Sequence, residues 1–237
     1  MNMKFGALLA LALGAAVTAQ ALEPPSPREA ALNGVWQLAT PVGKALRTAD
    51  GKAPPLLPAA QKLYDERKAM LAKHDTSFDP TYRCKPMGFP RSLWDGAPFD
   101  LQLQPTLVFM GFTWNRQHRA LDFAAKLPPY QGPRYFGTAV AHWDGDVLVV
   151  ESEGYNDPTL LDSSGLPHAE NMHLLERYSS AQGGKELDVR LTITDPANYS
   201  KPWDVALKYT RVPGGRILED VCEDRLGLYK DVRTIPD

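Results

Sequence analysis

Apolar and polar residues alternate along most of the chain after residue 100, and this two-residue period predicts β-strands. Short turn-forming pairs separate the alternating runs, among them Asp144-Gly145, Gly183-Gly184 and Gly214-Gly215. An earlier segment, "LNGVWQL" from Leu32 to Leu38, predicts one more short strand. The later strands are expected at Leu101–Gly111, Asn115–Phe123, Tyr135–Trp143, Asp146–Ser152, Met172–Tyr178, Glu186–Thr194, Trp203–Val212 and Arg216–Cys222.

Only one segment has the spacing of a helix. In "LPAAQKLYDERKAMLAKHD", Leu63, Met70 and Leu71 recur at helical intervals among Lys, Glu and Ala, which predicts an amphipathic helix near 57–74. The strands follow one another with little helix between them, so an antiparallel meander is the simplest topology. About eight or nine strands are enough to close a barrel or to form a strongly bent sheet. We therefore expect an all-β fold.

A meander sorts its connections between two ends. The tight turn at Asp144-Gly145 marks one end, and it predicts that Trp143 pairs with Asp146 and His142 with Val147. The long connections 84–96, 126–135, 154–171 and 195–202 then all fall at the other end, which we call the open end. Since a ligand enters a barrel by its mouth, these connections predict the rim of a pocket.

The first residues form a targeting segment. Lys4 precedes the apolar run "ALLALALGAAVTA", and "AQA" from Ala19 to Ala21 is typical of a cleavage site, so residues 1–21 are expected to be a signal peptide. A single β-barrel domain would then occupy residues 22–237, in the periplasm or outside the cell. No other apolar stretch is long enough to span a membrane. The net charge of −2 and the lack of a basic run argue against nucleic acid as a partner.

The two cysteines, Cys84 and Cys222, are a lone pair in a chain that is expected to be secreted. Such a pair usually forms a disulfide in an oxidising compartment. The last expected strand carries Cys222 to the open end, where Cys84 also lies, so the loop placement and the disulfide support each other. Two free thiols are the alternative.

Titratable residues gather at the expected rim. Histidine beside a carboxylate is the commonest acid–base arrangement in enzymes, and tyrosine can serve as a second donor. Asp157 and Asp162 also stand in turn-forming sequences, where carboxylates often cap backbone N–H groups instead. Glu176 is expected to form a structural ion pair with its neighbour Arg177. The expected catalytic residues are His168, His173, Glu151, Asp157, Glu170, Tyr135 and Tyr199.

Aromatic, amide and charged residues of the same connections are candidates for binding the substrate. These candidates are Trp94, Tyr130, Asn156, Asp162, Lys201, Trp203 and Arg91. The run "HAENMH" offers metal-ligand types, but it lacks the helical His-Glu-x-x-His pattern of metalloproteases, so a metal is only the weaker alternative. No phosphate-binding loop and no Gly-x-Ser-x-Gly elbow is present, so no organic cofactor is expected.

The segment "HWDGDVLVVESEGYNDPTLLDSSGLPHAENMHLLERY" resembles a family of secreted bacterial proteins that is largely uncharacterised. The shared motif reads W-x-GD-x-LVV, then G-[FY]-ND-x-T, then LD-x-x-G-x-PH-x-E-x-x-H, with Tyr155 here where Phe is commoner. The resemblance also includes "DPTYRCKPMGFPR" and "TDPANYSKPW" and covers most of residues 79–223. It implies a lipocalin-like, or calycin-like, barrel and no particular reaction.

These patterns lead to one principal hypothesis. The chain is expected to be a secreted enzyme without an organic cofactor, which performs His/carboxylate acid–base chemistry of lyase or isomerase type. Its substrate would be a small apolar or aromatic organic molecule held in the barrel mouth. The alternative is a periplasmic lipocalin-like carrier of a hydrophobic small molecule, and a purely structural or interaction protein is the third possibility.

Overall fold

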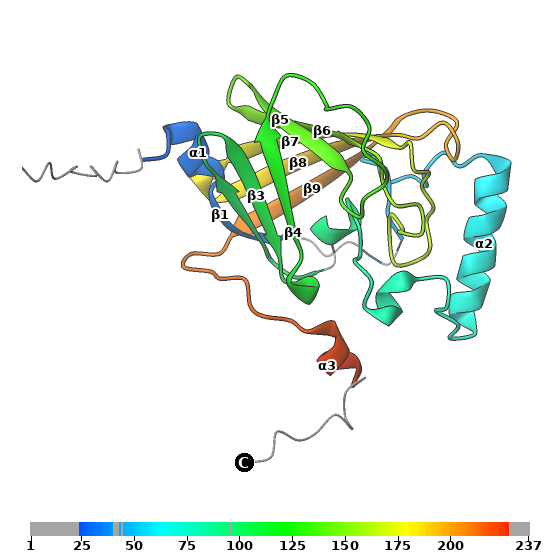
Figure 1. The fold of residues 1–237 in the computed structure, drawn as a ribbon. Coiled ribbons are helices and arrows are strands. Elements are labelled where there is room, and N and C mark those ends of the chain that lie inside the picture. Colours follow the sequence, from blue (N-terminus) through cyan, green and yellow to red (C-terminus); the bar gives the residue numbers. More distant parts are fainter. Residues whose placement is uncertain (1–23, 40–42, 44, 95, 228–237) are drawn as a thin grey trace, which may run out of the picture.

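The fold is a closed barrel of nine strands in sequence order, in which β1 pairs with both β2 and β9 (Figure 1). The computed structural model describes residues 24–39, 43, 45–94 and 96–227, so the expected signal peptide lies outside the described residues. The strands are β1 (Gly34–Leu38), β2 (Phe99–Leu103), β3 (Leu107–Phe112), β4 (His118–Phe123), β5 (Thr138–Asp144), β6 (Val147–Glu153), β7 (His173–Ala181), β8 (Glu186–Thr194) and β9 (Trp203–Arg211). The expected all-β barrel is thus confirmed.

The strand count agrees with the sequence because two errors cancel. The expected strand Leu101–Gly111 is a hairpin of β2 and β3, in which Leu103 pairs with Val108. The expected strand Arg216–Cys222 does not form; residues 216–221 are irregular and Cys222 begins a short helix. The barrel is already closed when the chain reaches residue 212, so no strand position is left for that segment.

One neighbouring pair departs from the antiparallel meander. β4 and β5 are parallel, with Asp122 opposite Val140 and Phe123 opposite Ala141. The connection 124–137 therefore has to return along the length of the barrel. It reaches the expected open end, where the Arg134 amide donates to the Gly154 carbonyl at 2.9 Å.

The β5–β6 hairpin has a different register from the expected one. Asp144 pairs with Val147 and His142 with Val149, so the turn residues are Gly145 and Asp146. The shift is by two positions, which leaves each residue on its expected face because side chains alternate with the same period. Ala141, Leu148 and Val150 face the barrel interior and are fully buried.

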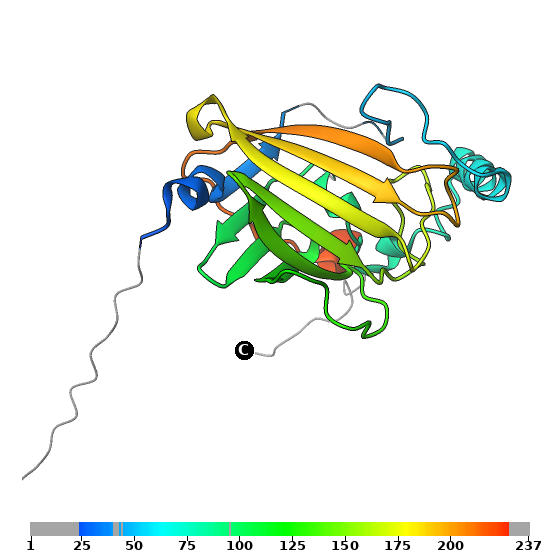
Figure 2. The same ribbon diagram turned by 90° about the horizontal axis from the view of Figure 1, so that it is seen from above.

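The two longest helices of the described residues lie at opposite ends of the barrel (Figure 1). α1 (Pro27–Leu32) lies at one end, where the Leu32 carbonyl accepts the Trp36 indole N–H at 2.8 Å. α2 (Pro58–Ala72) falls within the helical segment expected near 57–74, but it buries only Ala60 and Tyr64 and so is barely amphipathic. It lies beside the loops at the other end rather than over the barrel mouth (Figures 1 and 2). None of the helices in the described ranges is long and apolar enough to cross a membrane.

The chain after β9 returns along the outside of the barrel. Residues 212–221 run outside the barrel to α3 (Cys222–Leu226) (Figure 1). The backbone N–H of Asn115 donates to the Asp220 carboxylate at 2.7 Å. Cys222 then forms a disulfide with Cys84, with the Cα atoms 5.5 Å apart. The expected disulfide is therefore confirmed, although an irregular segment and not a strand brings Cys222 to it.

Candidate functional site

The expected open end of the barrel is closed by two loops, residues 79–94 and 154–172, which together we call the plug. Apolar residues of the plug belong to the same continuous core as the inward-facing strand residues. Those members are Phe89, Leu93, Trp94, Tyr155, Leu161, Leu166 and Met172, each at most 7 % exposed. Among the described residues the long loops thus cover the barrel interior, which corrects the expectation of an open mouth.

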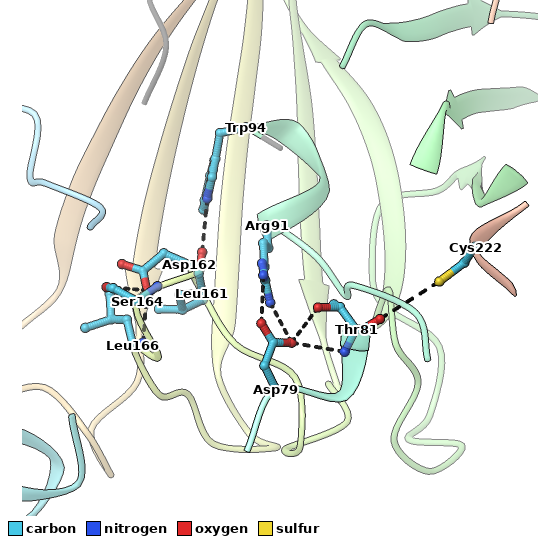
Figure 3. Close-up of polar contacts among 9 residues, drawn as sticks. All are labelled: Asp79, Thr81, Arg91, Trp94, Leu161, Asp162, Ser164, Leu166 and Cys222. Carbon is cyan, nitrogen blue, oxygen red and sulfur yellow. Dashed lines mark hydrogen bonds and ion pairs between the residues drawn. The ribbon is translucent and has the colours of Figure 1, made fainter. Parts of the chain in front are cut away.

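Asp162 organises one half of the plug. Its carboxylate, 1 % exposed, accepts from the backbone amides of Ser164 and Leu166 at 3.0 Å each (Figure 3). It also accepts from the backbone amide of Leu46 at 2.7 Å. These bonds satisfy backbone donors that would otherwise be buried without partners. Asp162 therefore has the capping role left open as an alternative, and its oxygens are engaged by the protein rather than offered to a substrate.

Arg91 and Trp94 hold the other half of the plug. The Arg91 guanidinium makes two hydrogen bonds to the buried Asp79 carboxylate, at 3.1 and 2.9 Å. The Trp94 indole N–H donates to the Leu161 carbonyl at 3.1 Å and so joins the two loops (Figure 3). Both residues were expected to bind substrate, and in the structure both bind the plug together.

His168 is buried within the plug and only 5 % exposed. Its Nε2 lies 2.7 Å from the Thr159 hydroxyl and its Nδ1 lies 3.0 Å from the Ala169 carbonyl oxygen. The expected partner Glu170 is exposed, and its carboxylate accepts from the Tyr130 hydroxyl instead. The structure therefore does not form the His168–Glu170 pair, and burial lowers the pKa of His168.

The lowered pKa of His168 predicts a pH-dependent stability. In the unfolded chain His168 binds a proton as the pH falls below its ordinary pKa of 6.5, whereas in the folded chain it does so only at lower pH. The neutral, buried His168 therefore contributes fully to stability above pH 6.5, and this contribution is lost as the pH falls below that value. We expect His168→Gln to flatten the decline of the melting temperature between pH 7 and pH 5. The control His173→Gln, on an exposed surface, is expected to keep the wild-type slope. A His168→Gln protein with the wild-type slope would show that another group causes the decline.

The other expected catalytic residues do not converge on one place. His173 and Glu151 are about 40 % exposed on the outside of the barrel, with His173 Nε2 3.9 Å from the Glu151 carboxylate. Asp157 is exposed and Tyr135 is half-buried. Tyr199 is buried, and its hydroxyl donates to the Pro167 carbonyl at 2.7 Å. Within the described ranges, no three His, Cys, Asp or Glu side chains are arranged to hold a metal ion.

The remaining substrate-binding candidates are also dispersed. Lys201 and Trp203 line a surface cleft of about 470 Å³ together with residues 48–50, 52, 53 and 55. Tyr130 is exposed at the tip of its loop, and the Asn156 carbonyl accepts from the Thr159 amide at 3.0 Å. The sequence thus placed most of these residues near one end of the barrel, but the structure does not bring them to a shared pocket.

A charged pair lies inside the barrel that the sequence did not reveal. Arg119 on β4 and Glu176 on β7 are 3 % and 0 % exposed, and the Arg119 Nη1 donates to both carboxylate oxygens at 2.8 and 3.0 Å. Glu176 was expected to pair with Arg177. Strand alternation prevents that, because Arg177 faces outwards, where it binds Asp144 at 2.6 Å.

Hydroxyl groups extend this buried pair towards the plug. The Tyr178 hydroxyl donates to Glu176 at 2.6 Å, and the Ser152 hydroxyl donates to the other carboxylate oxygen at 3.3 Å. Ser152 also lies 2.5 Å from the hydroxyl of Tyr155, which belongs to the plug. Burial raises the pKa values of both tyrosines, so both phenols are neutral. The result is a continuous chain of polar groups from Tyr155 to Arg119.

Several buried polar side-chain atoms have no hydrogen-bond partner within the protein, and two of them belong to Arg119 of this network. In the described part of the chain they are the Arg119 Nε and Nη2, both amide atoms of Gln117, and the Trp203 Nε1. Each unsatisfied group costs about 1–3 kcal/mol, so a fold retains such groups only for a reason. Nε and Nη2 of Arg119 form one side of the planar guanidinium, which is the geometry that binds two neighbouring oxygen acceptors.

Aromatic rings border these free donors. The Arg119 guanidinium lies 3.9 Å from the centre of the Phe89 ring, and Phe89 in turn packs against Phe112 and Phe136 at 6.3 Å. The site therefore combines an apolar aromatic wall with a fixed positive group, a carboxylate and neutral hydroxyls.

No protein-family model matches this chain, and no curated protein or solved structure matches it either.

Proposed function

We propose that the chain is an enzyme that removes a proton next to the carbonyl group of a small, neutral, apolar or aromatic molecule inside the barrel. Such a step starts isomerase and lyase reactions. The observation that carries the proposal is the free N–H pair of Arg119, which lies in the same buried network as a hydroxyl chain that ends at Glu176. A site for proton abstraction needs hydrogen-bond donors for the carbonyl oxygen and an acceptor for the proton, and Arg119 and the hydroxyl chain would supply them.

Arg119 would stabilise the charge that develops on the carbonyl oxygen. Its Nε and Nη2 hydrogens are fixed by the Glu176 bonds on the other side of the guanidinium. Fixed donors in a site without bulk water stabilise a developing oxyanion strongly, because they need no reorganisation during the reaction.

The hydroxyl chain would accept the proton. The Tyr155 oxygen takes the proton from carbon while Tyr155 passes its own proton to Ser152 and Ser152 passes its proton to Glu176. Before the step, the Arg119 charge is balanced by Glu176; after it, Glu176 is neutral and the enolate balances Arg119. The number of buried charges stays the same, which favours a neutral carbonyl substrate over a carboxylate, since an added buried charge costs several kcal/mol.

Entry to this site requires the plug to move. Phe89 of the plug lies against the Arg119 guanidinium, and the plug covers the barrel interior, so a substrate would enter past these loops. Lids that open to admit a substrate and close to exclude water are common in enzymes. The aromatic residues Phe89, Phe112 and Phe136 match an apolar or aromatic substrate.

The disulfide supports a location in the periplasm or outside the cell. Disulfides persist in oxidising compartments and are rare in the cytosol, and the Cys84–Cys222 bond agrees with the signal peptide expected from the sequence.

A carrier of a hydrophobic small molecule is the second candidate. The apolar lining of the barrel favours it, because binding without reaction needs only the aromatic wall and the Arg119 donors. The two functions differ in one observable: a carrier binds a ketone without exchanging its α-protons.

Exchange of α-protons in D2O, followed by NMR with cyclohexanone and acetophenone as probes, tests the proposal. We expect the wild-type chain to catalyse the exchange and Tyr155→Phe to reduce the rate by about 100-fold, at the lower end of acid–base contributions. Tyr199→Phe is the matched control, since it removes a buried phenol whose hydroxyl donates to the Pro167 carbonyl and takes no part in the proposed proton path. Binding of both ketones without exchange would favour the carrier. Loss of activity in Tyr199→Phe would contradict the Arg119 site and would favour an active site among the loops at the expected open end of the barrel.

A further inference from the structure

We infer that the substrate carries a hydroxyl group on the carbon next to its carbonyl, and that Gln117 recognises this hydroxyl. The inference rests on the proposed function and names the substrate class for the same site. Gln117 makes none of the contacts of the Arg119–Glu176 network, and both atoms of its side-chain amide are buried without a partner within the described part of the protein.

Gln117 directly precedes β4, and extending the β3–β4 register by one residue puts its side chain on the inner face. Met110 pairs with Arg119 and Gly111 with His118, and the Phe112 amide donates to the Gln117 carbonyl at 2.8 Å, which continues the ladder. His118 points outwards and stacks on Phe109 at 5.7 Å. Alternation therefore turns the Gln117 side chain to the same side as Arg119, with Cα atoms about 6–7 Å apart.

The two side chains offer different hydrogen-bonding groups. The free part of Arg119 has donors only, whereas the Gln117 amide has a donor and an acceptor, and both of these amide atoms are buried without a partner. A carbonyl oxygen of a substrate only accepts hydrogen bonds, so it cannot bond the oxygen of the Gln117 amide. A hydroxyl can accept from Arg119 and donate to the Gln117 oxygen, so a group of this kind bonds both residues at once.

The geometry of Arg119 selects neighbouring oxygens. Nε and Nη2 point the same way from one side of the guanidinium and so match two acceptors that are close together. The carbonyl and hydroxyl oxygens of an α-hydroxy ketone have this arrangement. After proton removal the same two oxygens belong to an enediolate, whose charge lies at the Arg119 donors. An ammonium group in place of the hydroxyl would add a buried positive charge, and the neutral hydroxyl avoids it.

An apolar residue at position 117 should be better for stability alone. Removing a buried polar group that has no partner also removes its desolvation cost. We expect Gln117→Met to raise the melting temperature by about 2–4 °C, the shift that about 1 kcal/mol causes in a chain of this size.

The experiment compares α-proton exchange of 2-hydroxycyclohexanone with that of cyclohexanone. We expect the wild-type chain to prefer the hydroxy ketone in kcat/KM by about 100-fold, and Gln117→Met to reduce this ratio to about threefold or less. Gln102→Met, which changes a glutamine bonded to Asp100 outside the barrel, is the control and should keep the wild-type ratio. Gln117→Leu is the second variant if Gln117→Met does not fold.

The outcomes separate this inference from the proposed function. Equal exchange of both ketones, or a preference that survives Gln117→Met, overturns the role of Gln117 and leaves the proposed function standing. Exchange of neither ketone by the wild-type chain overturns the proposed function and this inference with it. A lower melting temperature of Gln117→Met, with the preference intact, would identify Gln117 as a structural residue.

Discussion

Glu176→Gln is expected to lower the free energy of unfolding by about 3–5 kcal/mol, the range for breaking one side of a buried ion pair. The substitution preserves the size of the side chain but leaves the Arg119 charge in the barrel without a counter-charge, and both residues are almost fully buried. The Tyr178 and Ser152 hydroxyls lose a carboxylate acceptor at the same time. Urea denaturation followed by tryptophan fluorescence measures the loss.

Two further variants make this result specific. The double variant Arg119→Met/Glu176→Leu removes both charges and should recover much of the lost stability, because an apolar pair of similar volume often replaces a buried ion pair without loss. Asp144→Asn breaks the exposed pair with Arg177 and should cost at most about 1 kcal/mol. Equal effects of Glu176→Gln and Asp144→Asn would contradict the buried placement of Glu176.

Removing the disulfide is expected to cost up to about 5 kcal/mol in the double variant Cys84→Ser/Cys222→Ser. The two cysteines are 138 residues apart, so the bond closes most of the chain into a loop and restricts the unfolded state strongly. It also ties the plug to the segment that runs outside the barrel. Both effects predict a lower urea midpoint, which is measured beside the wild-type protein.

Alkylation with and without reduction is the control for the disulfide. In the unreduced wild-type protein, mass spectrometry should find neither Cys84 nor Cys222 alkylated, and after unfolding and reduction it should find both. Alkylation of both residues without reduction would show that the bond is absent, and the double variant should then be about as stable as the wild type.

The strands were predictable where turns and alternation agree. β8 has the expected bounds, Glu186–Thr194, because strict alternation begins directly after the Gly183-Gly184 turn. The hairpin within Leu101–Gly111 was missed although Pro105, which cannot donate to a strand ladder, marks its turn. The segment Arg216–Cys222 has the residues of a strand, but pairing also needs a free neighbour, and no short-range pattern shows that the barrel is already full.

The site was less predictable than the fold, because its members meet only in the closed barrel. Arg119 and Glu176 lie 57 residues apart, on strands that are not neighbours in sequence, and no short-range pattern pairs them. The plug residues were placed at the correct end, since loop length and topology decide that. Their burial was not predictable, because polar turn residues such as Asp162 bind the backbone of the plug itself, which the sequence left open as an alternative.

The pairing of the first strand with the last has a consequence for how the chain assembles. Trp36 on β1 lies opposite Arg211 on β9, so the barrel closes through residues almost at the two ends of the described chain. Until β9 is in place, β1 and β8 each present a sheet edge with unpaired N–H and C=O groups, which is a template for aggregation. Arg211 stabilises the β1–β9 pairing. Its guanidinium lies 4.3 Å from the centre of the Trp36 ring and donates a hydrogen bond to the Ala31 carbonyl at 2.7 Å. Protection from aggregation therefore depends on β9, the last strand of the described residues.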